Sequence, residues 1–276
     1  QPASGDSGCS IGSALAFWYI HLKKKRVIDK NDGMYGSLLG PDFNTKSIKM
    51  SLDKIGAKYL KYDKQKMIKR IASFISRGKA IGWFQGRMEF GPRALGSRSI
   101  IADPRNSRMQ KQLNLKIKFR ESFRPFAPVV LEQKCKEWFD LEGNSPYMLF
   151  VSKLNKTKLT KLSSKDQSLS SINFKRSIVP SVTHVDNSAR IQTVSKEKNG
   201  IFYELINEFY RLTNTPILIN TSFNIRGEPI VCSPEDAFRC FMGTDLDILV
   251  IENFIMEKNK QSRNLVEDYK DRFNLD

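Results

Sequence analysis

The chain has 276 residues, a hydrophobic content of 40% and a formal net charge of +17. The length suits one large or two ordinary domains, and 18 Phe together with the hydrophobic content exclude an intrinsically disordered chain. The positive charge predicts an anionic partner, but nucleic acid, an anionic membrane and phosphorylated metabolites all satisfy it.

Cysteine and histidine usage indicates a reduced protein without a self-contained metal centre. The four Cys form no CxxC pair, and two His cannot supply a site that needs several imidazole ligands. The longest apolar run, residues 14–20, is too short to span a bilayer. The first residues lack a charged n-region and a cleavage site, so no signal peptide is expected. We therefore expect a cytoplasmic protein.

The predicted elements alternate from residue 65 onward. Residues 1–22 predict a Gly/Ser turn that leads into a helix, and residues 23–64 are basic and irregular, as in a connector. Helices are predicted at residues 65–77, 107–117, 201–212 and 234–241, the last with Ser233 as N-cap and Pro234 in the first turn. Strands are predicted at residues 80–84, 99–102, 127–130, 148–151, 190–194, 216–220 and 248–251. This alternation favours an α/β or α+β fold built on a sheet.

Residues 152–177 interrupt this pattern. They contain seven Ser, seven Lys/Arg and one acidic residue, with little periodic hydrophobicity. This composition predicts a mobile surface loop or a hairpin extension, and a lid that grips an anion is the alternative.

Residues 86–128 hold ten Lys/Arg against three Asp/Glu. Five of the basic residues stand among Gly, Pro and aromatic residues: Arg87, Arg93, Arg98, Lys118 and Arg124. Guanidinium groups offer a rigid fork of donors that matches phosphate, and Lys adds a point charge, so this stretch indicates a site for a small, highly charged anion. The alternatives are a Gly-rich turn with exposed arginines in GPRALGSRS, and a basic edge strand or a single-stranded nucleic-acid surface in KFRESFRPFAP.

Two later motifs add polar side chains near strand candidates. The motif THVDNSARIQTV contains His184, Asp186 and Arg190; the histidine is as readily a packed residue as a catalyst, and the arginine is a candidate anion ligand. The motif PILINTSFNIRGEPIV contains Asn220, Thr221, Ser222 and Asn224. An apolar strand that ends in amides and hydroxyls is a common place for a pocket, here for phosphate, ribose or base edges. The alternative is a polar turn capped by its own side chains.

Together these motifs resemble one enzyme family. The chain contains the segments GRMEFGPRALGSRSIIADPR, KFRESFRPFAP, SPYML, THVDNSARIQTV and NTSFNIRGEPIV. Their order resembles that in the C-terminal domain of the nodulation-type and antibiotic-biosynthetic O-carbamoyltransferases. The resemblance covers about residues 65–255 and implies a YrdC-like mixed, twisted sheet with flanking helices over residues 65–265. Residues 1–22 resemble the closing segment of that family's actin-like ATPase-fold domain. Residues 1–40 are therefore interpreted as the end of that domain and a connector, and the chain as the back half of a two-domain enzyme.

The resemblance implies a carbamoyltransferase that converts carbamoyl phosphate and ATP into carbamoyl adenylate with release of pyrophosphate. The actin-like domain would then transfer the carbamoyl group to a hydroxyl of a sugar or natural-product acceptor. Motif matching implies carbamoyl phosphate ligands at Arg93, Arg98, Lys118, Arg124 and Arg190, and a nucleotide side at Asn220, Thr221, Ser222 and Asn224. The residues implied to act in the chemistry are Arg93, Lys118, Arg124 and His184.

The same resemblance implies two metal ions. Mg²⁺ would accompany ATP. A second metal ion, for which iron is a candidate, would lie in the actin-like domain. There the Asp of the GDxG turn, here Asp6, joins two histidines of an upstream segment as a ligand. The expected partners are these small molecules, without membrane or nucleic acid, and a homodimer is left open. The alternatives are an RNA-binding or tRNA-modification-related YrdC-type module, which a charge of +17 would suit, and an inactive, truncated fragment.

Overall fold

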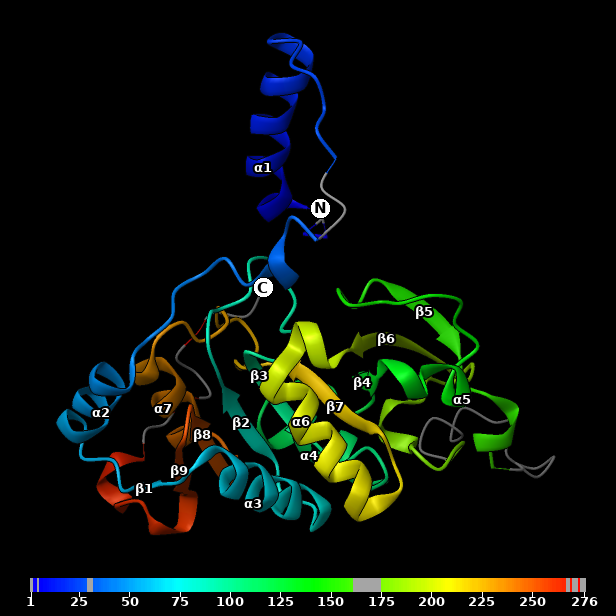
Figure 1. Ribbon diagram of the computed structural model, residues 1–276. Coiled ribbons are helices and arrows are strands. Elements are labelled where there is room, and N and C mark those ends of the chain that lie inside the picture. The colour runs from blue at the N-terminus through cyan, green and yellow to red at the C-terminus, as the bar shows by residue number, and fades with distance from the viewer. Residues whose placement is uncertain are drawn as a thin grey trace.

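A nine-stranded mixed sheet forms the centre of the computed structural model, which describes residues 2–3, 5–28, 32–160, 175–266, 269 and 273. Its strands are β1 (Leu60–Lys61), β2 (Ile81–Phe84), β3 (Arg98–Ala102), β4 (Ala127–Leu131), β5 (Phe150–Lys153), β6 (Ser188–Val194), β7 (Ile217–Ser222), β8 (Ile248–Ile251) and β9 (Phe254–Glu257). Their order across the sheet is β1-β9-β8-β2-β3-β7-β4-β6-β5 (Figure 1). The pairs β2–β8 and β4–β6 are parallel, and the other pairs are antiparallel. The predicted α/β class is confirmed.

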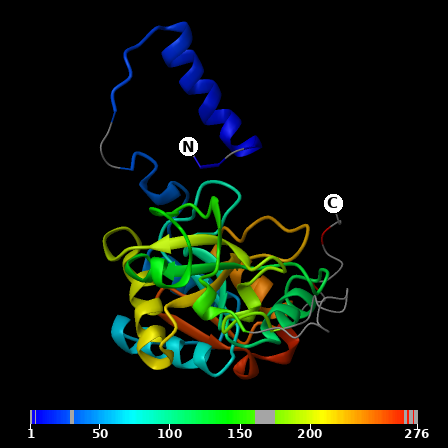
Figure 2. The ribbon, with the colours of Figure 1, turned by 90° about the vertical axis from the view of Figure 1, so that its right-hand side faces the viewer.

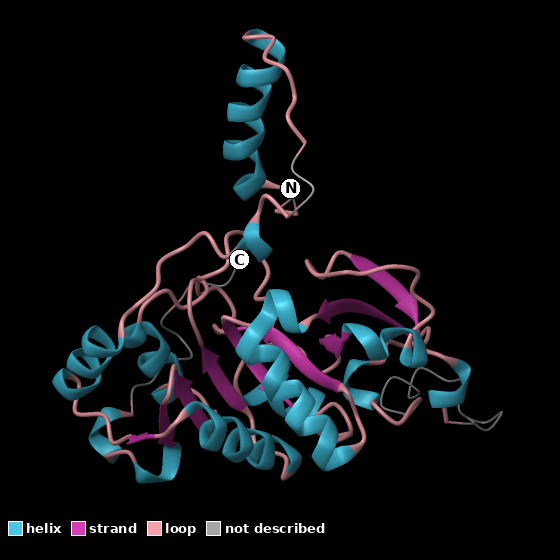
Figure 3. Ribbon diagram, in the orientation of Figure 1, coloured by secondary structure: helices cyan, strands magenta, loops and turns pink. Residues whose placement is uncertain are grey.

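Helices cover this sheet on both faces (Figure 3). The described α-helices are α1 (Asp6–Ala16), α2 (Thr45–Lys54), α3 (Lys64–Ser76), α4 (Met109–Lys116), α5 (Cys135–Trp138), α6 (Lys196–Thr213) and α7 (Pro234–Met242). On one face α3 packs beside α6. Helix α3 forms because Met67, Ile71 and Ile75 recur at helical spacing and are buried against the sheet. The Asp63 carboxylate caps its first turn.

The opposite face of the sheet is covered by α2, α4 and α7, whose apolar residues share one core. Helix α7 begins as predicted, because Ser233 and Asp236 form a capping box and Pro234 occupies the first turn. The seven predicted strands occur as β2 to β8, with β5 shifted by two residues, and the predicted helices occur as α3, α4, α6 and α7.

The interpretation of residues 23–64 as an irregular connector is wrong for their second half. Asn44 caps α2 by accepting a hydrogen bond from the N–H of Ser47, and β1 pairs with β9, so this segment belongs to the body around the sheet. Only Ile48 and Leu52 are buried along α2. Two apolar positions are too few for helical spacing to stand out in the sequence.

The Ser- and Lys-rich segment 152–177 is described only at its two flanks, since residues 161–174 lie outside the described part. Leu159 and Ser177 form an antiparallel bridge, and the N–H of Ile178 donates to the carbonyl of Lys158. The described flanks therefore have the form of a hairpin, and the interpretation of the segment as a lid falls on residues that are not described.

The N-terminal helical segment stands away from the sheet (Figure 1 and Figure 2). The helix predicted in residues 1–22 occurs as α1, and a π-helical turn continues it over Phe17–His21 with Trp18 and Ile20 exposed. Ala3 is buried against Gly91, where an added Cβ would lie 2.9 Å from the Ala3 methyl. None of the helices in the described part is long and apolar enough to cross a membrane.

Candidate anion-binding site

The loop between β2 and β3, which carries the GPRALGSRS motif, is fixed from its inner side. The buried carboxylate of Glu89 accepts hydrogen bonds from the N–H groups of Leu95 (2.7 Å) and Ser97 (2.6 Å). Gly96 has φ 118°, and a Cβ there would lie 2.3 Å from the ring of Phe202, so only glycine fits. Arg93, on the exposed side, is thereby presented by a rigid loop.

Two buried amides hold the same loop over the sheet. Asn220 on β7 donates from Nδ2 to the carbonyl of Ala94 (3.0 Å) and to Oε1 of Gln192 (2.6 Å). Gln192 in turn donates to the carbonyl of Leu95 (2.7 Å), so the network determines which end of each amide is the nitrogen. The Oδ1 of Asn220 is buried and has no hydrogen-bond partner among the described residues. A buried acceptor without a partner destabilises the site unless an ordered water or a ligand brings a donor.

Two pockets adjoin at this point. The first, here called the Arg93 pocket, has a volume of about 140 Å³ and is lined by Pro92, Arg93, Ala94, Arg120, Pro125, Phe126, Ala127, Met148, Arg190, Asn220, Thr221 and Ser222. The second, the Lys118 pocket, has a volume of about 400 Å³ and is lined by Lys118, Arg120, Arg124, Ser222, Asn224, Ile225, Arg226, Gly227, Glu228 and Pro229. Arg120 and Ser222 line both pockets, so a ligand larger than one pocket can extend into the other.

The sheet topology brings these side chains together. Strand β4 lies between β7 and β6, and its first residue, Ala127, pairs with Asn220 on one side. The parallel register of β4 with β6 places Arg190 at the same level on the other side. Burial lowers the pKa of Arg190, and the charge of Arg93 acts in the same direction. Two guanidinium groups that repel each other across a pocket favour an anion between them.

Lys118 supports the polar turn that follows β7. Its Nζ donates to Oδ1 (2.8 Å) and the carbonyl (2.9 Å) of Asn224, and it also contacts the carbonyl and the Oγ (3.3 Å) of Ser222. Burial lowers the pKa of Lys118 to about 7, and the charge of Arg120 adds to this effect. The predicted ligand Lys118 and the predicted nucleotide residue Asn224 therefore line one pocket as a single hydrogen-bonded unit.

Arg120 is a site residue that the sequence does not single out. It is the only arginine shared by the two pockets among the residues that line them. Its guanidinium lies over the ring of Phe126 at 5.0 Å, and its Nε donates to the buried Asn114. Burial and the charge of Arg124 lower the pKa of Arg120 to about 10. The signal in the sequence is weak, because Arg120 stands between Lys118 and Arg124 in KFRESFRPFAP, and nothing local distinguishes it from these two residues.

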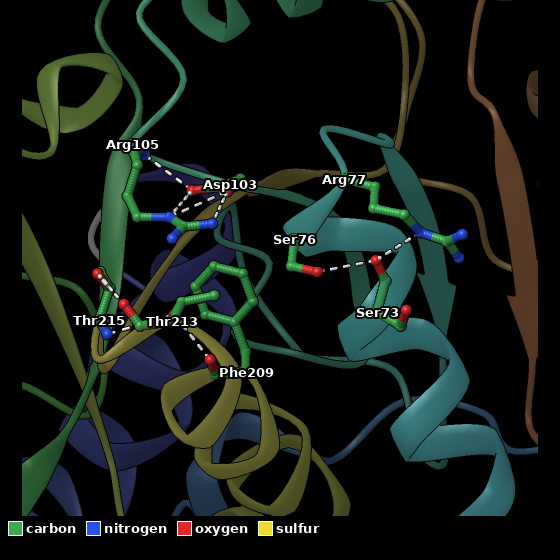
Figure 4. Close-up of polar contacts among 8 residues, drawn as sticks. All are labelled: Ser73, Ser76, Arg77, Asp103, Arg105, Phe209, Thr213 and Thr215. Atoms are coloured by element: carbon green, nitrogen blue, oxygen red, sulfur yellow. Dashed lines mark hydrogen bonds and ion pairs between the residues drawn. The ribbon is translucent and has the colours of Figure 1, made fainter.

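Arg98 and Arg105, from the same basic stretch, lie outside both pockets. The guanidinium of Arg98 stacks at 3.5 Å on the ring of Phe84, so the predicted carbamoyl phosphate ligand is separated from the others. It donates to the carbonyls of Gln85, Gly86, Ser97 and Pro41. Arg105 pairs with Asp103 through two nitrogens (Figure 4). Its guanidinium carbon lies 5.3 Å from the centre of the Phe209 ring. Both guanidinium groups are therefore engaged by other groups of the protein.

His184 lines a third cavity of about 290 Å³, here called the Phe123 cavity. The lining residues are Ser107, Gln110, Lys111, Ser122, Phe123, Pro125, Lys175, Arg176, Pro180, Thr183, His184 and Val185. Burial lowers the pKa of His184, with Arg190 acting in the same direction and Asp186 against it. His184 therefore lies beside the Arg93 pocket rather than in it.

The predicted metal ligand Asp6 begins α1, but its side chain lies outside the described part of the chain. Within the described ranges, no group of three or more His, Cys, Asp or Glu side chains gathers as metal ligands would. The metal prediction for Asp6 therefore stays a prediction.

The fold and the order of the motifs define a carbamoyltransferase C-terminal domain. The family model described as Carbamoyltransferase C-terminus matches residues 72–258, and the chain belongs to this family. It is 49% identical over 282 residues to an uncharacterized protein of Synechocystis sp., with 100% of the chain and 46% of that protein covered. The nodulation proteins NolNO of Sinorhizobium fredii and NolO of Bradyrhizobium diazoefficiens are 39% and 37% identical, over 95% of the chain and 36% and 45% of their own lengths. The chain thus spans less than half the length of these relatives, and the predicted family is confirmed.

Proposed function

We propose that this chain forms carbamoyl adenylate from carbamoyl phosphate and ATP. The observation that carries the proposal is the buried, unpartnered Oδ1 of Asn220, a residue that lines the same pocket as Arg93 and Arg190. An anion with an N–H group of its own satisfies this environment. The carbamoyl amine would donate to Oδ1 while the ligand oxygens accept from the arginines.

Carbamoyl phosphate would span the two pockets. Its carbamoyl end would lie in the Arg93 pocket at Asn220, and its phosphate would lie in the Lys118 pocket near Arg124 and Ser222. The phosphates of ATP would approach the carbamoyl end from the side of Arg190 and Thr221. In this arrangement Arg120 stands between two polyanions whose mutual repulsion its charge offsets.

The overall reaction consumes ATP, carbamoyl phosphate and water. A carbamoyl oxygen bonds to the α-phosphorus of ATP, the bond from that phosphorus to the bridging oxygen breaks, and pyrophosphate leaves with the electron pair. The phosphoryl group of carbamoyl phosphate leaves as inorganic phosphate, with an oxygen from water. The developing charge falls on phosphoryl oxygens, which fixed guanidinium groups stabilise without reorganisation.

The residues of the two pockets do not suit a protein-held Mg²⁺ site. Their one carboxylate, Glu228, already accepts hydrogen bonds from the N–H of Ile225 (2.8 Å) and from the hydroxyl of Tyr269. One engaged carboxylate is a poor Mg²⁺ ligand set, so the ion would be held mainly by the phosphates of the nucleotide. We propose that the activated carbamoyl group is then transferred to a hydroxyl of a sugar or natural-product acceptor.

The proposal is tested by pyrophosphate release from ATP in the presence and absence of carbamoyl phosphate. We expect release that depends on carbamoyl phosphate, and its loss in Asn220→Ala but not in the exposed control Asn259→Ala. Acetyl phosphate replaces the amine by a methyl group and leaves Oδ1 of Asn220 without a donor, so it should bind at least about tenfold more weakly. Equal affinities for the two acyl phosphates, or no pyrophosphate release, would contradict the proposal.

A further inference from the structure

The Phe123 cavity differs in character from the two anion pockets beside it. The surface that faces the two anion pockets is mostly polar, whereas more than half of the surface of this cavity is apolar, with Phe123, Pro125 and Pro180 among its lining residues. Its volume of about 290 Å³ is close to the lower end of small-molecule sites. Pro125 lines both this cavity and the Arg93 pocket, so the two spaces are neighbours at this residue.

Phe123 forms an exposed but well-supported platform in this cavity. Phe123 is 60% exposed, which leaves part of its aromatic ring in contact with solvent. The backbone beneath it is held by Gln110, whose Nε2 donates to the carbonyls of Phe123 (3.0 Å) and Arg124 (3.1 Å). An aromatic ring presented in this way can stack on a planar heterocycle, and every nucleobase has such a face.

The polar side chains around Phe123 are available to the edge of a base. The side chains of Ser107, Ser122 and His184 all line the cavity, and none of them has a hydrogen bond to another residue in the described ranges. Burial lowers the pKa of His184, which favours the neutral imidazole with one donor and one acceptor nitrogen. A neutral imidazole can therefore pair with either the donors or the acceptors of a base.

The cavity also lies close to two arginines of the Arg93 pocket. The charge of Arg190 reaches His184 closely enough to act on its pKa, and Arg190 faces Arg93 in the next pocket. We propose that the Phe123 cavity binds the base of the nucleoside triphosphate, stacked on Phe123, with the phosphates passing Pro125 toward Arg190 and Arg93. This inference rests on the proposed function. It places the base away from residues 220–224, where the sequence predicts the nucleotide, and leaves those residues to the reacting groups.

The affinities for ATP and for tripolyphosphate separate the base from the phosphates. We expect wild-type protein with Mg²⁺ to bind ATP more tightly than tripolyphosphate, and Phe123→Ala to weaken ATP binding on the order of tenfold with tripolyphosphate unchanged. Phe150→Ala is the matched control, because Phe150 is 55% exposed and lies on β5 outside the three pockets. The base site would be overturned if Phe123→Ala lost the same affinity for ATP and for tripolyphosphate, or lost affinity for neither. It would also be overturned if wild-type protein bound ATP no more tightly than tripolyphosphate.

Photolabelling locates the base without a substitution. We expect 8-azido-ATP to label peptides that contain residues 107–125 or 180–185, with protection by ATP and not by tripolyphosphate. Label confined to residues 217–230 would overturn the inference and would leave the proposed function intact if pyrophosphate release still depends on carbamoyl phosphate. A chain that binds neither ATP nor carbamoyl phosphate would instead contradict both.

Discussion

The Oδ1 of Asn114 accepts a hydrogen bond from Nε of Arg120 at 2.7 Å. The Nδ2 of the same amide donates to the carbonyls of Ser122 (3.1 Å) and Arg124 (2.9 Å). Asn114 is fully buried in α4. One amide therefore directs the guanidinium between the two pockets and also fixes the backbone that carries Arg124. An anion that binds there meets donors that are already oriented, which lowers the entropic cost of binding.

Replacing Arg120 should weaken the binding of carbamoyl phosphate and of the nucleotide phosphates together. We expect Arg120→Lys to reduce the affinities for carbamoyl phosphate and for tripolyphosphate by about tenfold each, because Lys keeps the charge but loses the planar fork and the bond from Nε to Asn114. Isothermal titration with each ligand separately measures this. Arg108→Lys, at an exposed position in the same basic stretch, is the control and should change neither affinity. A loss confined to one ligand would mean that Arg120 belongs to one pocket only.

Replacing Asn114 should affect stability and binding separately. We expect Asn114→Ala to lower the free energy of unfolding by about 1–3 kcal/mol, since two loop carbonyls lose their donor in a buried position. Because Arg120 also loses its orienting acceptor, the KM for carbamoyl phosphate should rise roughly tenfold with a smaller effect on kcat. Urea unfolding and steady-state pyrophosphate release measure the two effects. A destabilised variant with an unchanged KM would show that Asn114 supports only the fold.

The arginines of residues 86–128 show what local sequence can and cannot indicate. Arg93 and Arg98 stand five residues apart in the same GPRALGSRS motif, but Arg93 lies exposed in a loop, whereas Arg98 is the first residue of β3 and is buried. The buried position of Arg98 depends on contacts with distant segments, such as its hydrogen bond to the carbonyl of Pro41, 57 residues away in the chain. Strong periodicity predicts α3 and the central strands correctly, but not which arginines face a pocket.

The same limit applies to the polar residues after β7. The family resemblance, which rests on the motif NTSFNIRGEPIV, assigns Asn220, Thr221, Ser222 and Asn224 together to the nucleotide side. In the fold Asn220 and Thr221 line the Arg93 pocket, Asn224 lines the Lys118 pocket, and Ser222 lines both. Successive side chains at the end of a strand point in different directions, so they can line different pockets. The neighbouring loops determine which pocket each side chain lines.

Lys118 should couple anion binding to proton uptake. Its pKa is lowered to about 7 in the folded chain from an ordinary value of 10.5. Between these values the unfolded chain holds a proton that the folded chain lacks, so the free energy of unfolding rises with pH across that window. Below pH 7 the folded chain carries the full cost of burying the charge. A phosphate beside Nζ favours the charged form, so binding above pH 7 should take up a proton.

Calorimetry at pH 8 in buffers of different ionisation enthalpy measures this proton uptake. We expect an uptake of roughly 0.5–1 proton with carbamoyl phosphate, because most of the free protein has a neutral Lys118 at that pH. Lys118→Met should abolish the uptake, and the exposed control Lys116→Met should retain it. The same uptake in Lys118→Met would show that another group titrates, and that Lys118 only holds the turn after β7.

The loop that presents Arg93 should depend on the absence of a side chain at Gly96. In Gly96→Ala the new Cβ would lie 2.3 Å from the ring of Phe202 at a φ of 118°, so the backbone strain and the clash add. We expect urea unfolding to show a loss of about 2–4 kcal/mol, accompanied by weaker carbamoyl phosphate binding as the loop shifts. Gly12→Ala is the control, because no atom lies within 4 Å of an added Cβ there and alanine favours a helix. In a double-mutant cycle, Phe202→Leu should relieve the clash with the new Cβ but not the backbone strain. The two substitutions should therefore together cost less unfolding free energy than the sum of their separate losses, and additive losses would contradict this account of the loop.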